Sequence, residues 1–313
     1  MDLKDKILYY GVRGAVRLLG LIPFAGHEIL GKILGRAWYK ADKRHRNLAL
    51  KNIRYAYGDS VTPGEAEKLA KKVFENFAGM VFEHAWFNRL SPRAYHRYFN
   101  VKGKHHLYRA HAKGRGVICI SGHMGNWELG LAMYQMFRVP FCAVYKPIKN
   151  RGLNKYILEK RKIQGFEMVK KEGASKNVRK MLDKGYAAGL LIDQNTRRNH
   201  GVFIDFFGKK ACTNKNVAKL ALRTSAPVVP LFIYRENKFF VFEILPEVPL
   251  TKTADPESDI IENTQKFADI VEDFVRKRPQ QWFWIHNRWR TRPMEEKLKE
   301  SRVSVQTTIN QTA

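Results

Sequence analysis

The chain has 313 residues, 44% of them hydrophobic, so it can bury a substantial core in one large domain or two smaller ones. Its formal net charge of +28 points to an anionic partner: a phosphorylated lipid, an anionic membrane surface, nucleic acid or an acidic protein. Three cysteines with apolar neighbours make no disulfide framework and indicate reduced thiols in a cytosolic compartment. No C-x-x-C or H-x-x-x-H pair suggests a bound metal.

The sequence of residues 1–45 predicts helices that associate with a membrane. No charge-free stretch approaches the roughly 20 apolar residues that a spanning helix needs. The first helix has an apolar face and a basic face, a pattern that an ordinary helix packed on the core also shows. The apolar continuation over 18–24 and the basic residues after Lys40 favour an interfacial membrane helix. Its two faces comprise Leu8, Val12, Ala15, Val16 and Leu19 on one side, and Lys6, Arg13 and Arg17 on the other.

An α/β fold is expected after this region: a mixed central sheet covered by helices. The capping box Thr62-Pro63-Gly64-Glu65 begins a long helix to about Leu90. From about Tyr98, short apolar stretches alternate with helical ones, and a last helix covers about 257–277. We expect an α/β domain over 46–293 and a mobile tail over 294–313. The expected strands are 99–102, 117–120, 141–145, 187–192, 202–206, 228–233 and 239–244, and helices between them include 152–163, 174–184 and 216–225.

The block from Ser121 to Glu128 carries the strongest sign of chemistry. His123 stands on the turn after a buried strand, and Glu128 stands in the first turn of the expected helix. A carboxylate that holds one imidazole nitrogen leaves the other free to take a proton from a hydroxyl. We therefore expect His123 to be a general base oriented by Glu128, although such pairs also occur by chance on surfaces. No G-x-S-x-G motif is present and Cys119 lies in the apolar strand, so no covalent intermediate is expected.

This block resembles the H-x4-D/E signature of glycerolipid acyltransferases. Its sequence, Ser-Gly-His-Met-Gly-Asn-Trp-Glu, resembles that of one bacterial branch, which adds secondary acyl chains to lipid A. This branch comprises the lauroyl and myristoyl transferases of Gram-negative bacteria. The similarity covers about residues 20–293. Further motifs in the same order are Tyr145-Lys146-Pro147-Ile148-Lys149-Asn150, with lysine where arginine is usual, then Arg161, Leu191-Ile192-Asp193-Gln194-Asn195, and the segments 202–208, 226–230 and 284–293.

The resemblance implies an acyltransferase at the cytoplasmic face of the inner membrane, without a cofactor. Its donor would be acyl carrier protein bearing a saturated acyl thioester. Its acceptor would be the hydroxyl of a 3-hydroxyacyl chain on a Kdo-modified, phosphorylated glucosamine disaccharide, an anionic glycolipid. Both partners are acidic, which suits a chain of this charge.

Four further residues are expected to bind substrate. Arg161 suits an acidic group of donor or acceptor, and Lys146 does so more weakly because lysine is a point charge. Asp193, at a strand end, is expected to orient Arg161 or another basic group, or to cap a turn. Asn126 completes this set, and backbone N–H groups between Gly122 and Asn126, or a nearby basic side chain, are expected to hold the oxyanion.

Two other functions stay open. One is acylation of a different anionic membrane acceptor, a mannosylated phosphoinositide or a lysophospholipid, although aspartate is usual at the position of Glu128 in lysophospholipid enzymes. The other is nucleic-acid binding, since Trp282, Trp284 and Trp289 alternate with arginines near the C-terminus and the pI is about 10.1. No known nucleic-acid motif occurs, and this function leaves the His123 block unexplained, so we expect no nucleic-acid partner.

Overall fold

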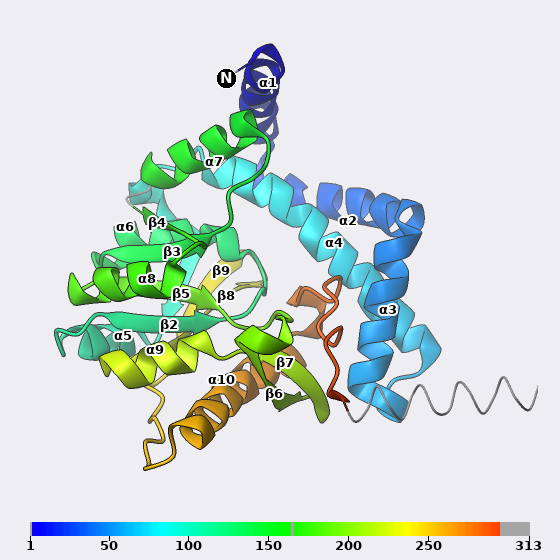
Figure 1. Ribbon diagram of the computed structural model, residues 1–313. Coiled ribbons are helices and arrows are strands. Elements are labelled where there is room, and N and C mark those ends of the chain that lie inside the picture. The colour runs from blue at the N-terminus through cyan, green and yellow to red at the C-terminus, as the bar shows by residue number, and fades with distance from the viewer. Residues whose placement is uncertain (1, 164–165, 295–313) are drawn as a thin grey trace, which may run out of the picture.

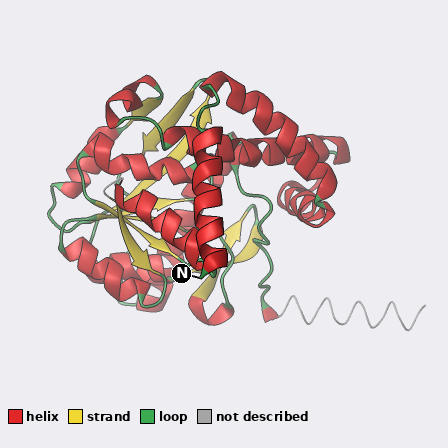
Figure 2. Ribbon diagram, turned by 90° about the horizontal axis from the view of Figure 1, so that it is seen from above, coloured by secondary structure: helices red, strands yellow, loops and turns green. Residues whose placement is uncertain are grey.

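A seven-stranded sheet forms the centre of the computed structural model, which describes residues 2–163 and 166–294 (Figure 1). The strand order is β1-β9-β8-β2-β5-β3-β4, and every neighbouring pair is parallel except β8 and β9. Figure 2 shows helices packed around these strands, so the predicted mixed sheet covered by helices is confirmed. The strands are β1 (Phe99–Lys102), β2 (Val117–Ser121), β3 (Phe141–Tyr145), β4 (Phe166–Lys170), β5 (Ala187–Leu191), β8 (Val228–Glu236) and β9 (Phe239–Ile244).

Three elements in the α/β part were not predicted from the sequence. Strand β4 lies at the edge of the sheet and exposes two of its five residues, Glu167 and Lys170, so its apolar pattern is weak. Helix α5 (Lys104–His111) buries Leu107 and Ala110 within a polar stretch. Strand β7 (Lys209–Asn214) pairs with β6 (Gly201–Phe206) in a separate antiparallel hairpin, so the strand expected over 202–206 does not join the central sheet.

The N-terminal part is helical, as predicted. It comprises α1 (Leu3–Leu19), α2 (Phe24–Ala41), α3 (Lys43–Tyr57) and α4 (Pro63–Phe87). The capping box at the start of α4 is present: the Thr62 N–H donates to Glu65 Oε2 at 2.8 Å, and the Glu65 N–H donates to Thr62 Oγ1 at 3.3 Å. Helices α2 and α4 touch through glycine, since a Cβ at Gly31 would lie 2.9 Å from Gly79 Cα. Helix α4 runs from beside α3 towards the sheet (Figure 1).

Helix α1 projects from the rest of the molecule (Figure 1). It buries Asp5 and Tyr9 against α7 (Arg151–Ile163), while its apolar residues Ile7, Leu8 and Val12 line an open groove on its surface. Within the described ranges no single helix is long and apolar enough to cross a bilayer. Helices α1 and α2 reach that length and composition together, but they meet at an angle of 118°. The most exposed large apolar residues of this region are Leu3, Ile7, Tyr10, Leu18, Leu21, Ile29 and Ile33.

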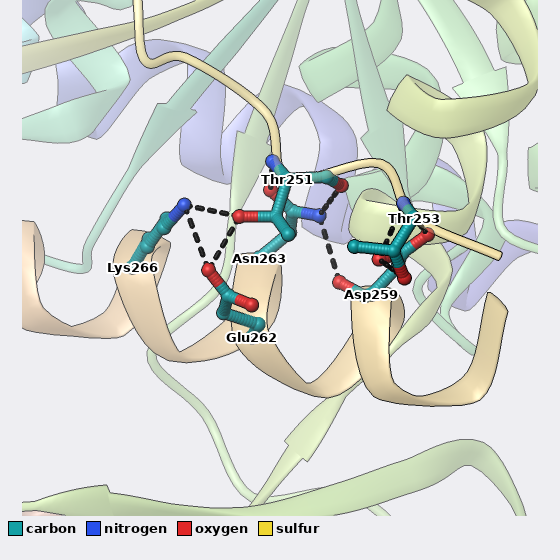
Figure 3. Close-up of polar contacts among 6 residues, drawn as sticks. All are labelled: Thr251, Thr253, Asp259, Glu262, Asn263 and Lys266. Carbon is teal, nitrogen blue, oxygen red and sulfur yellow. Dashed lines mark hydrogen bonds and ion pairs between the residues drawn. The ribbon is translucent and has the colours of Figure 1, made fainter. Parts of the chain in front are cut away.

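The C-terminal helix α10 (Pro256–Lys277) is tied to the segment before it (Figure 3). The Thr253 N–H donates to both carboxylate oxygens of Asp259 at 3.0 and 2.9 Å, and Asn263 Nδ2 donates to the Thr251 carbonyl at 2.8 Å. Glu262 and Lys266 both hydrogen-bond the Thr251 hydroxyl. The anchored helix leads the chain back to the carboxyl edge of the sheet. Beyond Met294, the expected tail lies outside the described residues.

The remaining helices lie against the sheet or at its edge. They are α6 (Met133–Phe137), α8 (Ala174–Asp183) and α9 (Asn216–Thr224). The helix expected directly after the His123 block begins instead as a 3-10 helix over Trp127–Ala132, and only its last five residues, Met133–Phe137, are α-helical. The position of Glu128 therefore differs from the one that a regular α-helix would give it.

Candidate active site

The register of two neighbouring strands brings His123 and Asp193 together. Strands β2 and β5 are parallel, and Ser121 pairs with Leu191 at the last position of each. Two residues further on, His123 Nδ1 lies 2.7 Å from Asp193 Oδ1, and the His123 N–H donates to Asp193 Oδ2 at 2.8 Å. One carboxylate thus holds both the ring and the backbone of the histidine, at the edge where α/β sheets place their chemistry.

Asp193 is buried and ionised. Only 2% of its side chain is exposed, and the Trp282 indole N–H donates to Oδ2 at 2.7 Å as a third hydrogen bond. Burial by itself raises the pKa of this carboxyl. The charge of His123 and the three hydrogen bonds outweigh burial and hold the pKa of Asp193 at about 2. Asp193 is therefore a fixed negative charge that favours the tautomer with the proton on Nδ1 and stabilises an imidazolium.

The other ring nitrogen of His123 faces a large cavity. His123 is about one-fifth exposed and stands edge-on to Trp127, with ring centroids 5.0 Å apart. Its Nε2 lies 3.2 Å from the amide nitrogen of Gln194. The cavity has a volume of about 1070 Å³, is mainly apolar and extends past Phe141 and Met168. An imidazole therefore stands at a cavity large enough to hold a long apolar molecule.

Glu128 does not contact His123, contrary to the expectation from the sequence. Both of its carboxylate oxygens accept hydrogen bonds from Arg161 NH2, at 3.1 and 2.9 Å. The 3-10 helix that begins at Trp127 directs Glu128 towards α7, whereas the strand register delivers Asp193 to the histidine. Of the two alternatives expected for Asp193, Arg161 or another basic group, the structure shows the second, because Asp193 holds His123 while Arg161 pairs with Glu128. Glu128 and Arg161 line the same cavity as His123 and form an ion pair there.

Asn126 is not placed to bind substrate. Its side chain is buried and does not line the cavity; its Nδ2 donates to Glu83 Oε2 at 3.0 Å. Glu83, on α4, also accepts from Arg235 NH1 at 2.6 Å. Burial raises the pKa of Glu83, and Arg235 opposes that rise. These contacts fix the loop behind His123. Lys146, in contrast, is exposed and lines the cavity.

Three of the backbone N–H groups expected to hold an oxyanion, those of residues 123–125, are already used. The His123 N–H donates to Asp193, the Met124 N–H to the Gly122 carbonyl, and the Gly125 N–H to the Gln281 carbonyl, the last two both at 2.8 Å. At these three positions no N–H is left for a ligand. Side chains that line the cavity, among them Gln194, Arg161 and Lys146, offer further donors.

The segment 282–289 packs against the site and holds two of its residues by hydrogen bonds. Trp282, Trp284, Trp289 and Arg288 are all buried, so the tryptophan cluster offers no stacking surface to nucleic acid. His286 accepts a hydrogen bond from the Asn195 N–H at 3.1 Å, and burial lowers the pKa of His286 to about 4, which keeps it neutral.

Sequence reasoning missed the roles of Trp282, Gln194 and His286. Gln194 adjoins a strand end and could have been singled out by that signal. The other two lie about 90 residues from their partners, and nothing local in the sequence marks them. Between residues 2 and 294, leaving out 164 and 165, no cluster of three or more His, Cys, Asp or Glu could hold a metal ion.

Comparison with known proteins identifies the family of this chain. A family model described as bacterial lipid A biosynthesis acyltransferase matches residues 3–291. A lipid A biosynthesis acyltransferase of Haemophilus influenzae is 25% identical over 93% of this chain and 91% of that protein. The lipid A biosynthesis palmitoleoyltransferase of Escherichia coli is 24% identical over 93% of each chain. A phosphatidylinositol mannoside acyltransferase of Mycolicibacterium smegmatis is 26% identical over 59% of this chain and 60% of its own length. Because the family model spans nearly the whole sequence, this chain belongs to the bacterial lipid A biosynthesis acyltransferase family.

Proposed function

We propose that this protein transfers a fatty acyl chain from acyl carrier protein to a hydroxyl of a Kdo-modified lipid A precursor, at the cytoplasmic face of the inner membrane. Membership of the family makes it an acyltransferase acting on lipid A or a related lipid. The observation that carries the finer proposal is the His123–Asp193 pair, which stands at a large, mainly apolar cavity that also contains a guanidinium, Arg161.

His123 acts as the general base. With its Nδ1–H donated to Asp193, the lone pair on Nε2 takes the proton of the acceptor hydroxyl as the oxygen attacks the thioester carbonyl. The tetrahedral intermediate then collapses, the C–S bond breaks, and the imidazolium returns the proton to the leaving thiolate. General-base assistance of this kind contributes about 10²–10⁴ in rate. The negative charge of Asp193 stabilises the imidazolium while it exists.

Gln194 is our choice for the oxyanion donor. Its amide nitrogen lies 3.2 Å from His123 Nε2, where it occupies the position that the acceptor hydroxyl must take. The entering hydroxyl displaces this amide by a small rotation of the side chain, which leaves the N–H₂ group beside the reacting carbonyl. The backbone N–H groups of residues 123–125 are occupied, which favours a side-chain donor for the tetrahedral oxygen.

Arg161 binds an anionic group of a substrate, and Glu128 positions it. The carboxylate of Glu128 holds the guanidinium in the cavity wall through two hydrogen bonds. A guanidinium can grip a phosphate or carboxylate with two donors while a third interaction fixes its direction. Lys146, exposed at the cavity, adds a mobile point charge. In this scheme Glu128 affects substrate binding more than proton transfer.

The outer surface of α1 suits a bilayer interface. Its apolar groove faces away from the rest of the chain, and the nearby residues Leu18, Leu21 and Ile29 are each more than 60% exposed. An apolar helix face with adjacent basic residues binds anionic membranes. The acceptor lipid would then reach the cavity from the membrane surface, and the acidic carrier protein would be attracted by the positive charge of the chain.

The decisive experiment uses detergent-solubilised protein, wild type and His123→Ala. Both are incubated with a panel of acyl-carrier-protein thioesters and the Kdo-modified tetra-acylated precursor, and mass spectrometry measures addition of one acyl chain. We expect acyl gain with the wild type and a loss of at least 10²-fold in the variant. No gain with any donor, from a folded protein, would reject this acceptor.

A mannosylated phosphoinositide is the second candidate acceptor. The similarity to a phosphatidylinositol mannoside acyltransferase over 59% of this chain favours it, and both acceptors are anionic membrane glycolipids. The same assay with that lipid in place of the lipid A precursor separates the two. Faster acyl gain on the mannosylated lipid would select the second candidate.

A further inference from the structure

Cationic side chains gather where α1 lies along α7. Asp5 meets Gly152, whose N–H lies 3.4 Å from Asp5 Oδ1, and one turn later Tyr9 contacts Tyr156 with ring centroids 6.3 Å apart. Residues spaced four apart on α1 therefore lie opposite residues spaced four apart on α7. Continuing this spacing places Arg13 on α1 opposite Lys160 on α7. Arg17 lies one turn further along the same face of α1. We call Arg13, Arg17 and Lys160 the α1–α7 cationic cluster.

No carboxylate forms an ion pair with the α1–α7 cationic cluster in the described part of the chain. The nearest acid on α7, Glu159, accepts from the Tyr9 hydroxyl at 2.6 Å and lies 3.7 Å from Lys155. Arg13 donates to the Tyr9 hydroxyl at 3.4 Å, and the Lys160 ammonium lies 6.0 Å from the Tyr156 ring centroid. Burial, followed by the charges of Arg13 and Arg17, lowers the pKa of Lys160, and the charge of Glu159 offsets only part of this effect. The three charges thus repel one another.

The position of this cluster links it to the active site. Lys160 directly precedes Arg161, and α7 lines the cavity through Ile157 and Arg161. The face of α7 that holds Lys160 meets α1, whose outer surface carries the apolar groove. An anion bound at the cluster would therefore lie between the apolar surface of α1 and the entrance to the catalytic cavity.

We propose that Arg13, Arg17 and Lys160 bind a phosphate group on the headgroup of the acceptor lipid. A phosphate offers several oxygens and close to two negative charges, which would relieve the repulsion among three cations and pair with the forked donors of arginine. The assignment of this lipid as the acceptor rests on the proposed function; the phosphate site itself rests on the cluster. The lipid would be held by its phosphate while its reacting hydroxyl enters the cavity.

The test is a binding measurement that needs no acyl transfer. Detergent micelles contain the phosphorylated glucosamine-disaccharide lipid or the same lipid after phosphatase treatment, and calorimetry measures affinity without donor. The variant is Arg13→Gln/Arg17→Gln/Lys160→Gln. The matched control is Arg179→Gln/Lys180→Gln/Arg223→Gln, which removes the same charge from exposed positions on α8 and α9.

We expect the cluster variant to bind the phosphorylated lipid at least tenfold more weakly, to bind the phosphatase-treated lipid almost as the wild type does, and the control to change less than threefold. Equal losses in both variants would show general electrostatic attraction and overturn the site. Inorganic phosphate that binds as tightly as the lipid would show a site for free phosphate instead. If the triple variant does not fold, Arg17→Gln, at an exposed position, carries the test with an expected loss of about threefold.

The phosphate site and the proposed reaction can each be refuted separately. A protein that shows the phosphate-dependent binding contrast but adds no acyl chain refutes the proposed reaction and keeps the site. Acyl transfer with an unchanged KM for the acceptor in the cluster variant keeps the reaction and refutes the site.

Discussion

Replacing Asp193 with asparagine tests the geometry that most distinguishes this site. Asparagine keeps the size of the side chain but removes its charge. Asp193 accepts three hydrogen bonds, from the His123 ring, the His123 N–H and the Trp282 indole. Asparagine has a single acceptor oxygen, and its amide N–H₂ group must face at least one of these donors. The variant therefore loses the tautomer control of His123 as well as the charge that stabilises its imidazolium.

The depressed pKa of Asp193 shows how strongly its surroundings favour the charged carboxylate. The pKa of Asp193 is about 2, against an ordinary value of 3.8. At about 1.4 kcal/mol per pH unit, the gap corresponds to about 2.5 kcal/mol, or roughly 60-fold in an equilibrium constant. This net value already includes the opposing cost of burial, so the favourable interactions of the carboxylate are larger. We expect kcat to fall by about 10²–10⁴, the range for loss of an oriented general base, with little change in KM.

The assay measures initial rates of acyl addition at saturating donor, with the acceptor concentration varied. Glu128→Gln is the matched control, because it also replaces a cavity carboxylate by its amide. Its partner is Arg161, so we expect mainly a raised KM and a fall in kcat of no more than about tenfold. Near wild-type kcat in Asp193→Asn together with a fall of about 10³ in Glu128→Gln would refute the reasoning and restore Glu128 as the partner of His123.

Three further predictions follow from buried contacts. Trp282→Phe removes one hydrogen bond to Asp193, so we expect kcat to fall about tenfold. The far-ultraviolet circular dichroism spectrum should stay the same, and an unaltered kcat would contradict the prediction. Glu83→Ala leaves Arg235 without its partner and should lower the free energy of unfolding by about 3 kcal/mol in urea, whereas Arg36→Ala, at an exposed pair, should cost about 0–1 kcal/mol. Because the folded pKa of Asp193 lies below its unfolded value, its stabilisation is present above pH 3.8 and is lost as the pH falls through about 2. The stability difference between wild type and Asp193→Asn should shrink over that interval, and a constant difference would show that the pKa is not depressed.

Much of the local structure could be predicted because it depends on short-range patterns. Apolar runs bounded by turn formers located β2, β3 and β5, and the capping box located the start of α4. The hairpin strand β7 and the edge strand β4 were missed because their polar residues face solvent, which weakens the pattern on which a strand prediction depends.

The partner of His123 could not be predicted from local patterns. Glu128 is five residues away in the sequence, yet it pairs with Arg161, while Asp193 is 70 residues away and touches the ring. Periodicity shows which residues form strands, but it does not show which strands become neighbours.

The sequence by itself determined the α/β class, the helical N-terminal part and the presence of His123 at the end of a strand, because each depends on the preferences of neighbouring residues. Only the tertiary structure decided which carboxylate serves the histidine. The order β8-β2-β5 aligns Ser121 with Leu191, which brings the residues two places beyond each strand end within reach of each other. Strand pairing converts a separation of 70 residues into a hydrogen bond of 2.7 Å, and that conversion depends on long-range packing that no local pattern encodes.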